Sequence, residues 1–167
     1  CIKEPTDYNN NKKNSKRIKR INKTMNSKYW DESGNELVSK KGKKVFDEIK
    51  KAVKDLSKIS KKSYIVYPEI ISAVNMLVGI SNQLATDAND EAQAFVGDKK
   101  ADKEIKKSNE EMNKAQKELD KGKPDKAIDK VKKAWEHARK AMKEKKVKDP
   151  KPIKEDNPKK EKKTKSD

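Results

Sequence analysis

The sequence predicts an all-α protein: an antiparallel bundle of about four helices with disordered basic N- and C-terminal tails. Between residues 38 and 142, apolar residues recur at spacings of three and four, which places them on one face of a helix. Lys, Glu, Ala and Asn dominate the composition, which favours helices over sheets. Charged residues make up 44% of the 167-residue chain and hydrophobic residues 31%, so only part of it has enough apolar side chains for a core.

The first helix is predicted in the segment after residue 38. Its apolar stripe consists of Val45, Phe46, Ile49, Ala52, Val53, Leu56 and Ile59. Lysines occupy the opposite face. Ser39 is the expected N-cap, because a serine hydroxyl can accept a hydrogen bond from a free backbone N–H of the first turn.

The second helix is predicted to begin at Pro68, since proline suits the first helical turn. Its apolar positions are Ile70, Ile71, Ala73, Val74, Met76, Leu77, Val78, Ile80 and Leu84. No charged residue lies between Glu69 and Asp87. A helix that is apolar almost all round is expected to be the central, most buried one. Residues 86–90 are expected to kink or break it, and Gly97 to mark the stop.

Two further helices are predicted on either side of Gly122 and Pro124, because Gly favours a helix end and Pro a helix start. The third helix starts near Asp98, and its narrow stripe is Ile105, Ser108, Met112, Ala115 and Leu119. The fourth has a fuller stripe: Ala127, Ile128, Val131, Ala134, Trp135, Ala138, Ala141 and Met142. Opposite charges spaced i,i+4, as in Asp47–Lys51 and Asp129–Lys133, predict weak ion pairs along the exposed faces.

The segment Gly122-Lys123-Pro124-Asp125-Lys126-Ala127-Ile128, followed by Lys133-Ala134, resembles the second half of a tetratricopeptide repeat. The resemblance covers residues 119–138 and is not repeated elsewhere in the chain. A stable repeat array needs at least about three copies. The segment is therefore interpreted as an ordinary helical hairpin with similar packing chemistry.

The remaining segments set the predicted domain organisation. Residues 1–28 carry nine Lys or Arg against two acidic residues and no sustained helical period, which predicts a disordered tether. Residues 29–37 are expected to form a loop or a small hairpin around Gly34. Residues 38–142 form the bundle. Residues 143–167, with eleven Lys among prolines, are predicted to be a disordered tail.

Cys1 is the first residue of the chain and its only cysteine. One thiol cannot form an internal disulfide or a thiolate metal cluster. A leading cysteine is typical of a mature lipoprotein, in which it carries the lipid. Cys1 is therefore the predicted lipid-attachment site, and the predicted location is extracytoplasmic and membrane-anchored, either at the cell surface or in the periplasm.

The overall layout resembles the small Lys-rich surface lipoproteins of low-GC bacteria, spirochaetes in particular. Shared features are Cys1, an Asn- and Lys-rich tether, a compact helical bundle and a Lys-rich tail. Among these proteins, the decorin-binding adhesins are closest in size and tail composition. That resemblance implies binding of glycosaminoglycans through basic residues, but no binding-site motif in the bundle is carried across.

The sharpest local feature of the N-terminal segment is a basic cluster. Two pairs of basic residues, Lys16-Arg17 and Lys19-Arg20, flank Ile18. This pattern suits a polyanion such as a sulfated glycan, a nucleic acid or anionic lipid headgroups. The alternative is a solvated tether whose charge maintains solubility and attracts it to the membrane.

No catalytic, metal-binding or cofactor-binding site is predicted. His137 is the only histidine, and neither a general base with its partner nor a zinc site can be assembled from it and Cys1. The predicted function is thus a non-enzymatic binding or adhesion module. One alternative is a cytoplasmic nucleic-acid-binding protein using its basic tails, although no nucleic-acid-reading motif appears. Another is a protein–protein scaffold, with Trp30 or Trp135 as an anchor in a groove.

Overall fold

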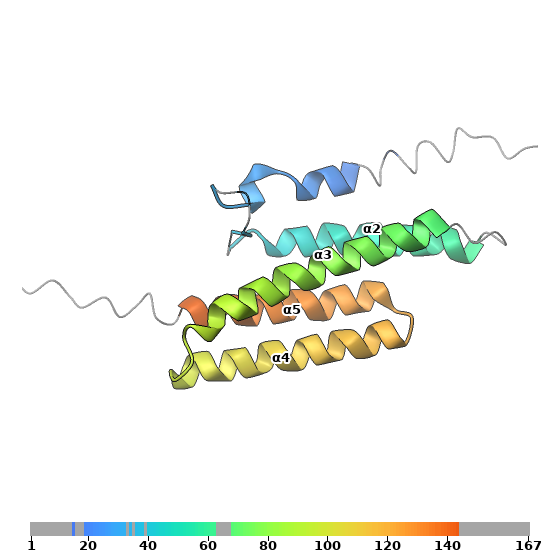
Figure 1. The fold of residues 1–167 in the computed structure, drawn as a ribbon. Helices are drawn as coiled ribbons and strands as arrows, with labels where there is room; N and C mark the ends of the chain where they lie inside the picture. The colour runs from blue at the N-terminus through green and yellow to red at the C-terminus, as the bar shows by residue number, and fades with distance from the viewer. Residues whose placement is uncertain are drawn as a thin grey trace, which may run out of the picture.

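The computed structural model describes residues 15, 19–32, 34, 36–38, 40–62 and 68–143. Four long helices lie side by side, and each runs antiparallel to the next (Figure 1). They are α2 (Lys43–Lys62), α3 (Pro68–Gln93), α4 (Lys99–Asp120) and α5 (Pro124–Lys143). The predicted all-α bundle is confirmed. Residues 1–14 and 144–167, which make up most of the two predicted tails, lie outside the described residues.

Local capping signals determine several of the helix boundaries. Helix α3 begins at Pro68, as predicted, and Asp98 caps α4 by accepting hydrogen bonds from the N–H groups of Lys100 and Ala101. At the end of α4, Gly122 has a φ of 64°. Its N–H donates to the Leu119 carbonyl at 2.8 Å, while the Lys123 N–H donates to the Glu118 carbonyl at 2.9 Å. This pair of bonds satisfies carbonyls that the helix end leaves free.

Two predicted boundary features differ from the structure. Helix α3 runs without a break to Gln93, so the expected kink at residues 86–90 does not occur. Thr86, Asp87 and Asp90 are exposed, and the half-buried Asn89 donates a hydrogen bond to Asn109. On the opposite side of the helix, Ala85, Ala88 and Ala92 are buried. Helix α2 begins only at Lys43, and the predicted cap Ser39 lies outside the described residues.

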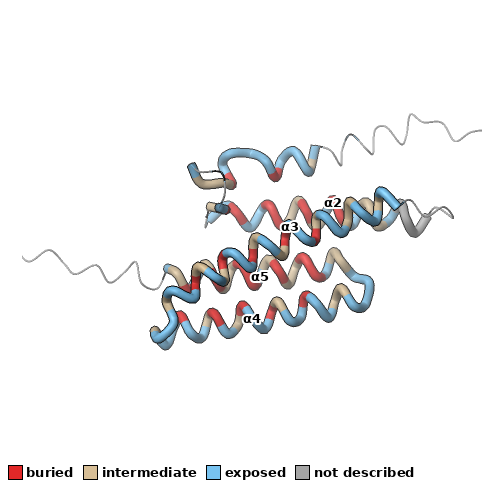
Figure 2. The backbone as a smooth tube through the Cα atoms, in the orientation of Figure 1, coloured by how far each residue is buried: buried red, intermediate tan, exposed pale blue. Residues whose placement is uncertain are grey.

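The central helix is α5, whereas the sequence predicted α3. Helix α5 packs against α2, α3 and α4, and it has more buried residues than α3 or α4 (Figure 2). Ala127, Ala134 and Ala138 are fully buried, and their small side chains allow neighbouring helices to approach closely. Helix α3 instead lies on one side of the bundle and leaves Ile71, Met76 and Ile80 exposed. No helix in the described ranges combines the length and the apolar character needed to span a bilayer.

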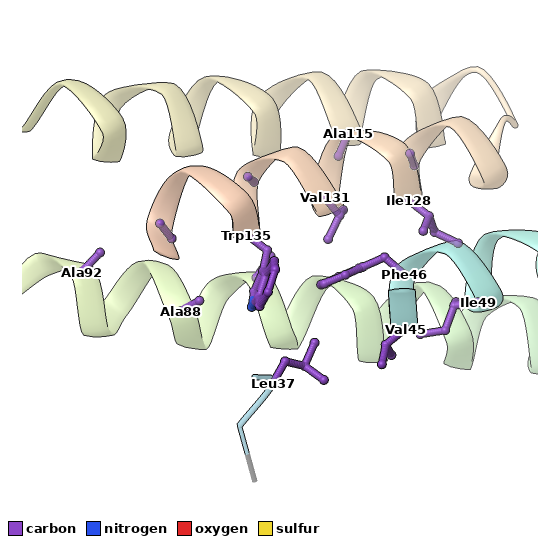
Figure 3. Packing of buried hydrophobic residues seen from close by; sticks show 14 of the residues in the cluster. Leu37, Val45, Phe46, Ile49, Ala88, Ala92, Ala115, Ile128, Val131 and Trp135 are labelled. Carbon is purple, nitrogen blue, oxygen red and sulfur yellow. The ribbon is translucent and has the colours of Figure 1, made fainter. Parts of the chain in front are cut away.

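The core is centred on Trp135, which is 2% exposed. Its ring lies 5.6 Å from the ring of Phe46, centroid to centroid, so it joins α5 to α2 (Figure 3). Leu37, from the segment before α2, belongs to the same cluster. Ser108 is also buried and donates its hydroxyl to the Ala134 carbonyl at 3.0 Å, which ties α4 to α5. The polar residue in the predicted α4 stripe therefore occupies a core position.

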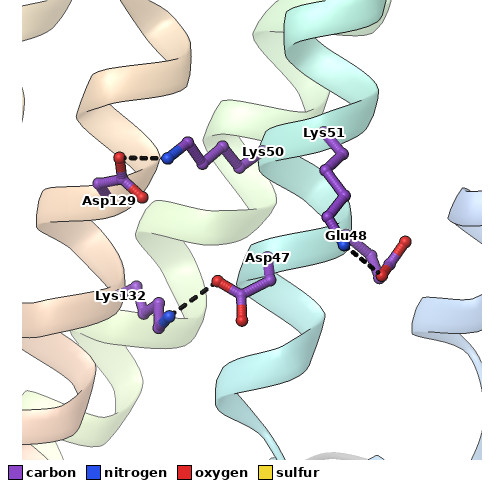
Figure 4. Close-up of polar contacts among 6 residues, drawn as sticks. All are labelled: Asp47, Glu48, Lys50, Lys51, Asp129 and Lys132. Carbon is purple, nitrogen blue, oxygen red and sulfur yellow. Dashed lines mark hydrogen bonds and ion pairs between the residues drawn. The ribbon is translucent and has the colours of Figure 1, made fainter.

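Charged residues link α2 to α5 along the edge of the core. Lys50 Nζ lies 2.5 Å from Asp129 of α5, and Lys132 Nζ lies 2.7 Å from Asp47 of α2 (Figure 4). The predicted pairs Asp47–Lys51 and Asp129–Lys133 are wrong, because each aspartate faces a lysine on the neighbouring helix. Lys51 pairs with Glu48 instead. All these side chains are partly exposed, so each pair contributes no more than about 1 kcal/mol.

The segment before the bundle is more structured than expected. We expected residues 1–28 to be a disordered tether, whereas residues 19–24 are helical and a short 3₁₀ helix, η1, spans Ser27–Tyr29. Trp30 Nε1 donates to the Thr24 carbonyl at 2.6 Å, and Arg20 pairs with Asp55 of α2. The sparse apolar residues of this segment gave no helical period. Its order comes from contacts with residues later in the chain.

Residues 29–37, for which we expected a loop or a small hairpin, close on themselves. Trp30 and Leu37 form an antiparallel bridge, flanked by backbone hydrogen bonds from Asp31 to Glu36 and from Val38 to Tyr29. Gly34, at a φ of 75°, lies in the turn. This closure places Leu37 against Trp135 in the core.

Candidate polyanion-binding surface

The structure describes only part of the predicted N-terminal basic cluster. Lys16 and Arg17 lie outside the described residues. Lys19 is exposed, but the guanidinium of Arg20 is engaged by the carboxylate of Asp55. Within the described residues, this cluster therefore presents one exposed lysine and one arginine that already has a partner.

A stronger concentration of positive charge occurs at the end of the bundle where α2 begins and α5 ends. Five cationic side chains line a surface hollow of about 450 Å³ there. They are Lys40, Lys43, Arg139, Lys140 and Lys143, and we call this surface the basic end. The lining also includes Trp135 and a single acidic residue, Glu136. A hollow of this size can accommodate several anionic groups of one ligand.

Most of the charge of the basic end is uncompensated. The four lysines make no ion pair with any described residue, whereas Arg139 Nη1 lies 3.4 Å from Glu91 and 3.6 Å from Glu36. Burial and the neighbouring Glu36 carboxylate raise the pKa of Glu91, which Arg139 only partly offsets. Helix α2 has no acidic residue in its first turn, so its N-terminal dipole adds to the positive potential.

Two other hollows of similar size have more acidic residues in their linings. One, of about 410 Å³, is lined by lysines beside Asp47 and Glu48, which pair with Lys132 and Lys51. The other, of about 460 Å³, has three acidic residues in its lining: Glu118, Asp129 and Glu136. Of the lysines that line them, Lys51, Lys130 and Lys132 form ion pairs with carboxylates, whereas the basic end has only Glu136 among its five cationic side chains. The basic end is therefore the best candidate for binding an external anion.

Sequence reasoning missed the basic end because its two halves are far apart in the chain. Lys40 and Lys43 precede and begin α2, while Lys140 and Lys143 lie in the last turn of α5. Both runs of lysine are visible in the sequence. Only the antiparallel packing of α2 against α5 brings them to the same end of the bundle.

His137 joins α5 to α4. Its Nδ1 lies 2.7 Å from Glu104 Oε2, and Lys107 Nζ lies 2.6 Å from the other carboxylate oxygen. Burial opposes ionisation of Glu104, but the hydrogen bonds from Lys107 and His137 outweigh it and hold the pKa below its ordinary value. Since the pKa of Glu104 is lowered, its ionised carboxylate stabilises the fold above about pH 4.5. This stabilisation is lost as the pH falls through the lowered pKa of Glu104.

Comparison with known proteins adds no functional assignment. The chain matches no protein-family model, no curated protein and no solved structure.

Proposed function

We propose that this chain is a non-enzymatic binding protein, held outside the cytoplasm by a lipid on Cys1, whose helical bundle binds polyanions. The single observation that carries the binding proposal is the basic end, where Arg139 and four lysines that make no ion pair with any described residue line one hollow. Anionic groups spaced along a polymer, such as the sulfates of a glycosaminoglycan, would contact several of these lysines together. Each contact releases bound counterions, which makes the affinity depend on salt.

The geometry of the tryptophans gives less support to a groove-binding scaffold. Trp135 is buried in the core, and the indole N–H of Trp30 is bonded to Thr24 within the same chain. An interface anchor needs an accessible aromatic side chain that a partner can cover. Polyanion binding uses side chains that are already exposed.

Replacing Lys40, Lys43, Lys140 and Lys143 with alanine is expected to weaken binding of heparin at least tenfold. Each lost contact should lower the slope of log affinity against log salt by about 0.7–0.9, if sulfates behave like phosphates. Titration calorimetry at two salt concentrations measures both quantities. The matched control replaces four exposed lysines elsewhere, which removes the same charge: Lys58, Lys103, Lys106 and Lys117. Equal losses in the two variants would assign binding to net charge alone and overturn the site.

The lipid anchor is tested separately by detergent phase partitioning of the natively expressed protein. The wild-type protein is expected in the detergent phase and the Cys1→Ala variant in the aqueous phase, because a lipid on Cys1 would supply the membrane affinity. A single acyl chain binds a membrane only weakly. Stable anchoring therefore needs either additional acyl chains or a basic segment as a second signal. If both proteins remain in the aqueous phase, the anchor proposal fails while the basic end stays open to its own test.

A further inference from the structure

Helix α3 presents a surface without charge to solvent. No charged residue occurs between Glu69 and Asp87, in a chain in which 44% of residues are charged. On this stretch Ile71 is 45% exposed, Met76 65% and Ile80 45%. Ile71 and Ile80 are nine residues apart, which places them at opposite edges of this uncharged face. An exposed face that lacks charge and carries large apolar side chains is a candidate interaction site.

Gly79 lies in the middle of this surface, and the fold gives no reason for a glycine there. Its φ is not positive, and a Cβ at this position would meet no atom within 4 Å. Glycine inside a helix destabilises it by about 0.5–1 kcal/mol relative to alanine. Glycine on an exposed helix face does, however, allow the backbone of another molecule to approach closely.

The surface is also complementary to itself about Gly79. Ser72 and Thr86 lie seven residues before and after Gly79, and this spacing places all three along one line of the helix. Asn75 and Gln83 lie four residues before and after it. All five are exposed. An antiparallel copy crossing at Gly79 would place Ser72 opposite Thr86, and Asn75 opposite Gln83, in pairs that can hydrogen-bond.

We propose that α3 pairs with α3 of a second copy of this chain, in an antiparallel two-fold arrangement that crosses at Gly79. Charge favours this occupant. The chain carries a net charge of +17, so two copies repel each other except where they meet through an uncharged face. A charged partner would find no counter-charge on this face.

The orientation of α3 in the bundle supports the antiparallel arrangement. The C-terminal end of α3 lies at the same end of the bundle as the start of α2 and the end of α5, which form the basic end (Figure 1). An antiparallel pair therefore directs the two basic ends in opposite directions and keeps them apart. Contact through one helix from each copy buries less than a standard interface of about 1,600 Å², so the dimer is expected to be weak.

Sedimentation equilibrium of the full chain, from micromolar to millimolar concentration, tests the proposal. The wild type is expected to be a monomer–dimer mixture. Gly79→Glu places two carboxylates opposite each other at the crossing and should raise the dissociation constant at least tenfold. Gln93→Glu makes the same charge change on the same helix, fourteen residues further along and past the uncharged stretch, and should behave like the wild type. Circular dichroism checks that both variants keep their helices.

Crosslinking tests the crossing point itself. In a Cys1→Ser background, a cysteine introduced at position 79 should form an intermolecular disulfide on mild oxidation, and one introduced at position 93 should not. A wild type that stays monomeric at millimolar concentration would overturn the proposal. So would a Gly79→Glu variant that dimerises normally, or equal crosslinking at the two positions.

Discussion

Replacing Trp135 with alanine is expected to lower the free energy of unfolding by about 3–5 kcal/mol, the range for truncating a large buried aromatic side chain. The indole is 2% exposed, packs against Phe46 and lies on the helix that contacts all three others. Domains of this size are stabilised by about 5–15 kcal/mol in total, so the substitution should remove a large part of the free energy of unfolding. Urea denaturation followed by circular dichroism measures the change.

A smaller change in the same helix provides the control. Ile128→Val removes one methylene group from a residue that is 1% exposed, and should cost about 0.5–1.5 kcal/mol. If Trp135→Ala cost no more than Ile128→Val, the indole would not be at the centre of the core. The assignment of α5 as the central helix would then need revision.

Replacing Gly42 with alanine is expected to destabilise the fold by about 1–3 kcal/mol through overpacking. Gly42 is buried directly before α2, and an added Cβ would lie 2.6 Å from Leu37 Cβ and 3.1 Å from Trp135 Cη2. Leu37 Cβ cannot move without moving its backbone, which the bridge to Trp30 holds. Thermal unfolding at low protein concentration measures the loss.

The same substitution at Gly79 is expected to have the opposite sign. Gly79 is helical and a Cβ there meets nothing within 4 Å, so Gly79→Ala should stabilise the monomer by about 0.5–1 kcal/mol. Performing both measurements at micromolar concentration keeps self-association out of the comparison. A stabilising Gly42→Ala would contradict the packing described around Gly42, and a destabilising Gly79→Ala would contradict the open space at Gly79.

The parts of the fold that depend on local signals could be predicted from the sequence. Pro68 and the pair Gly122 and Pro124 set helix boundaries through backbone geometry, which nearby residues determine. The apolar stripe of α5 also appears as predicted, with Trp135 buried. In each case the signal and the structure it specifies lie within a few residues of each other.

The identity of the central helix could not be predicted, because apolar content does not measure burial. Helix α3 has more large apolar side chains, but the buried face of α5 contains alanines, whose small side chains let the neighbouring helices approach closely. The basic end was missed for a related reason. Lys40 and Lys143 converge only through the packing of α2 against α5, a contact between distant parts of the chain.

The central position of α5 sets the order in which the bundle can form during synthesis. Of the four described helices, α5 is the last to leave the ribosome, and the contacts that it makes with α2 join residues as far apart as Asp47 and Lys132, separated by 85 positions. Until α5 emerges, the apolar faces of α2 and α3 have no complete core to cover them. The α4–α5 hairpin needs only local contacts, so it is expected to form first and to recruit the two earlier helices. A chain truncated before Pro124 would lack this nucleus and expose apolar surface that favours aggregation.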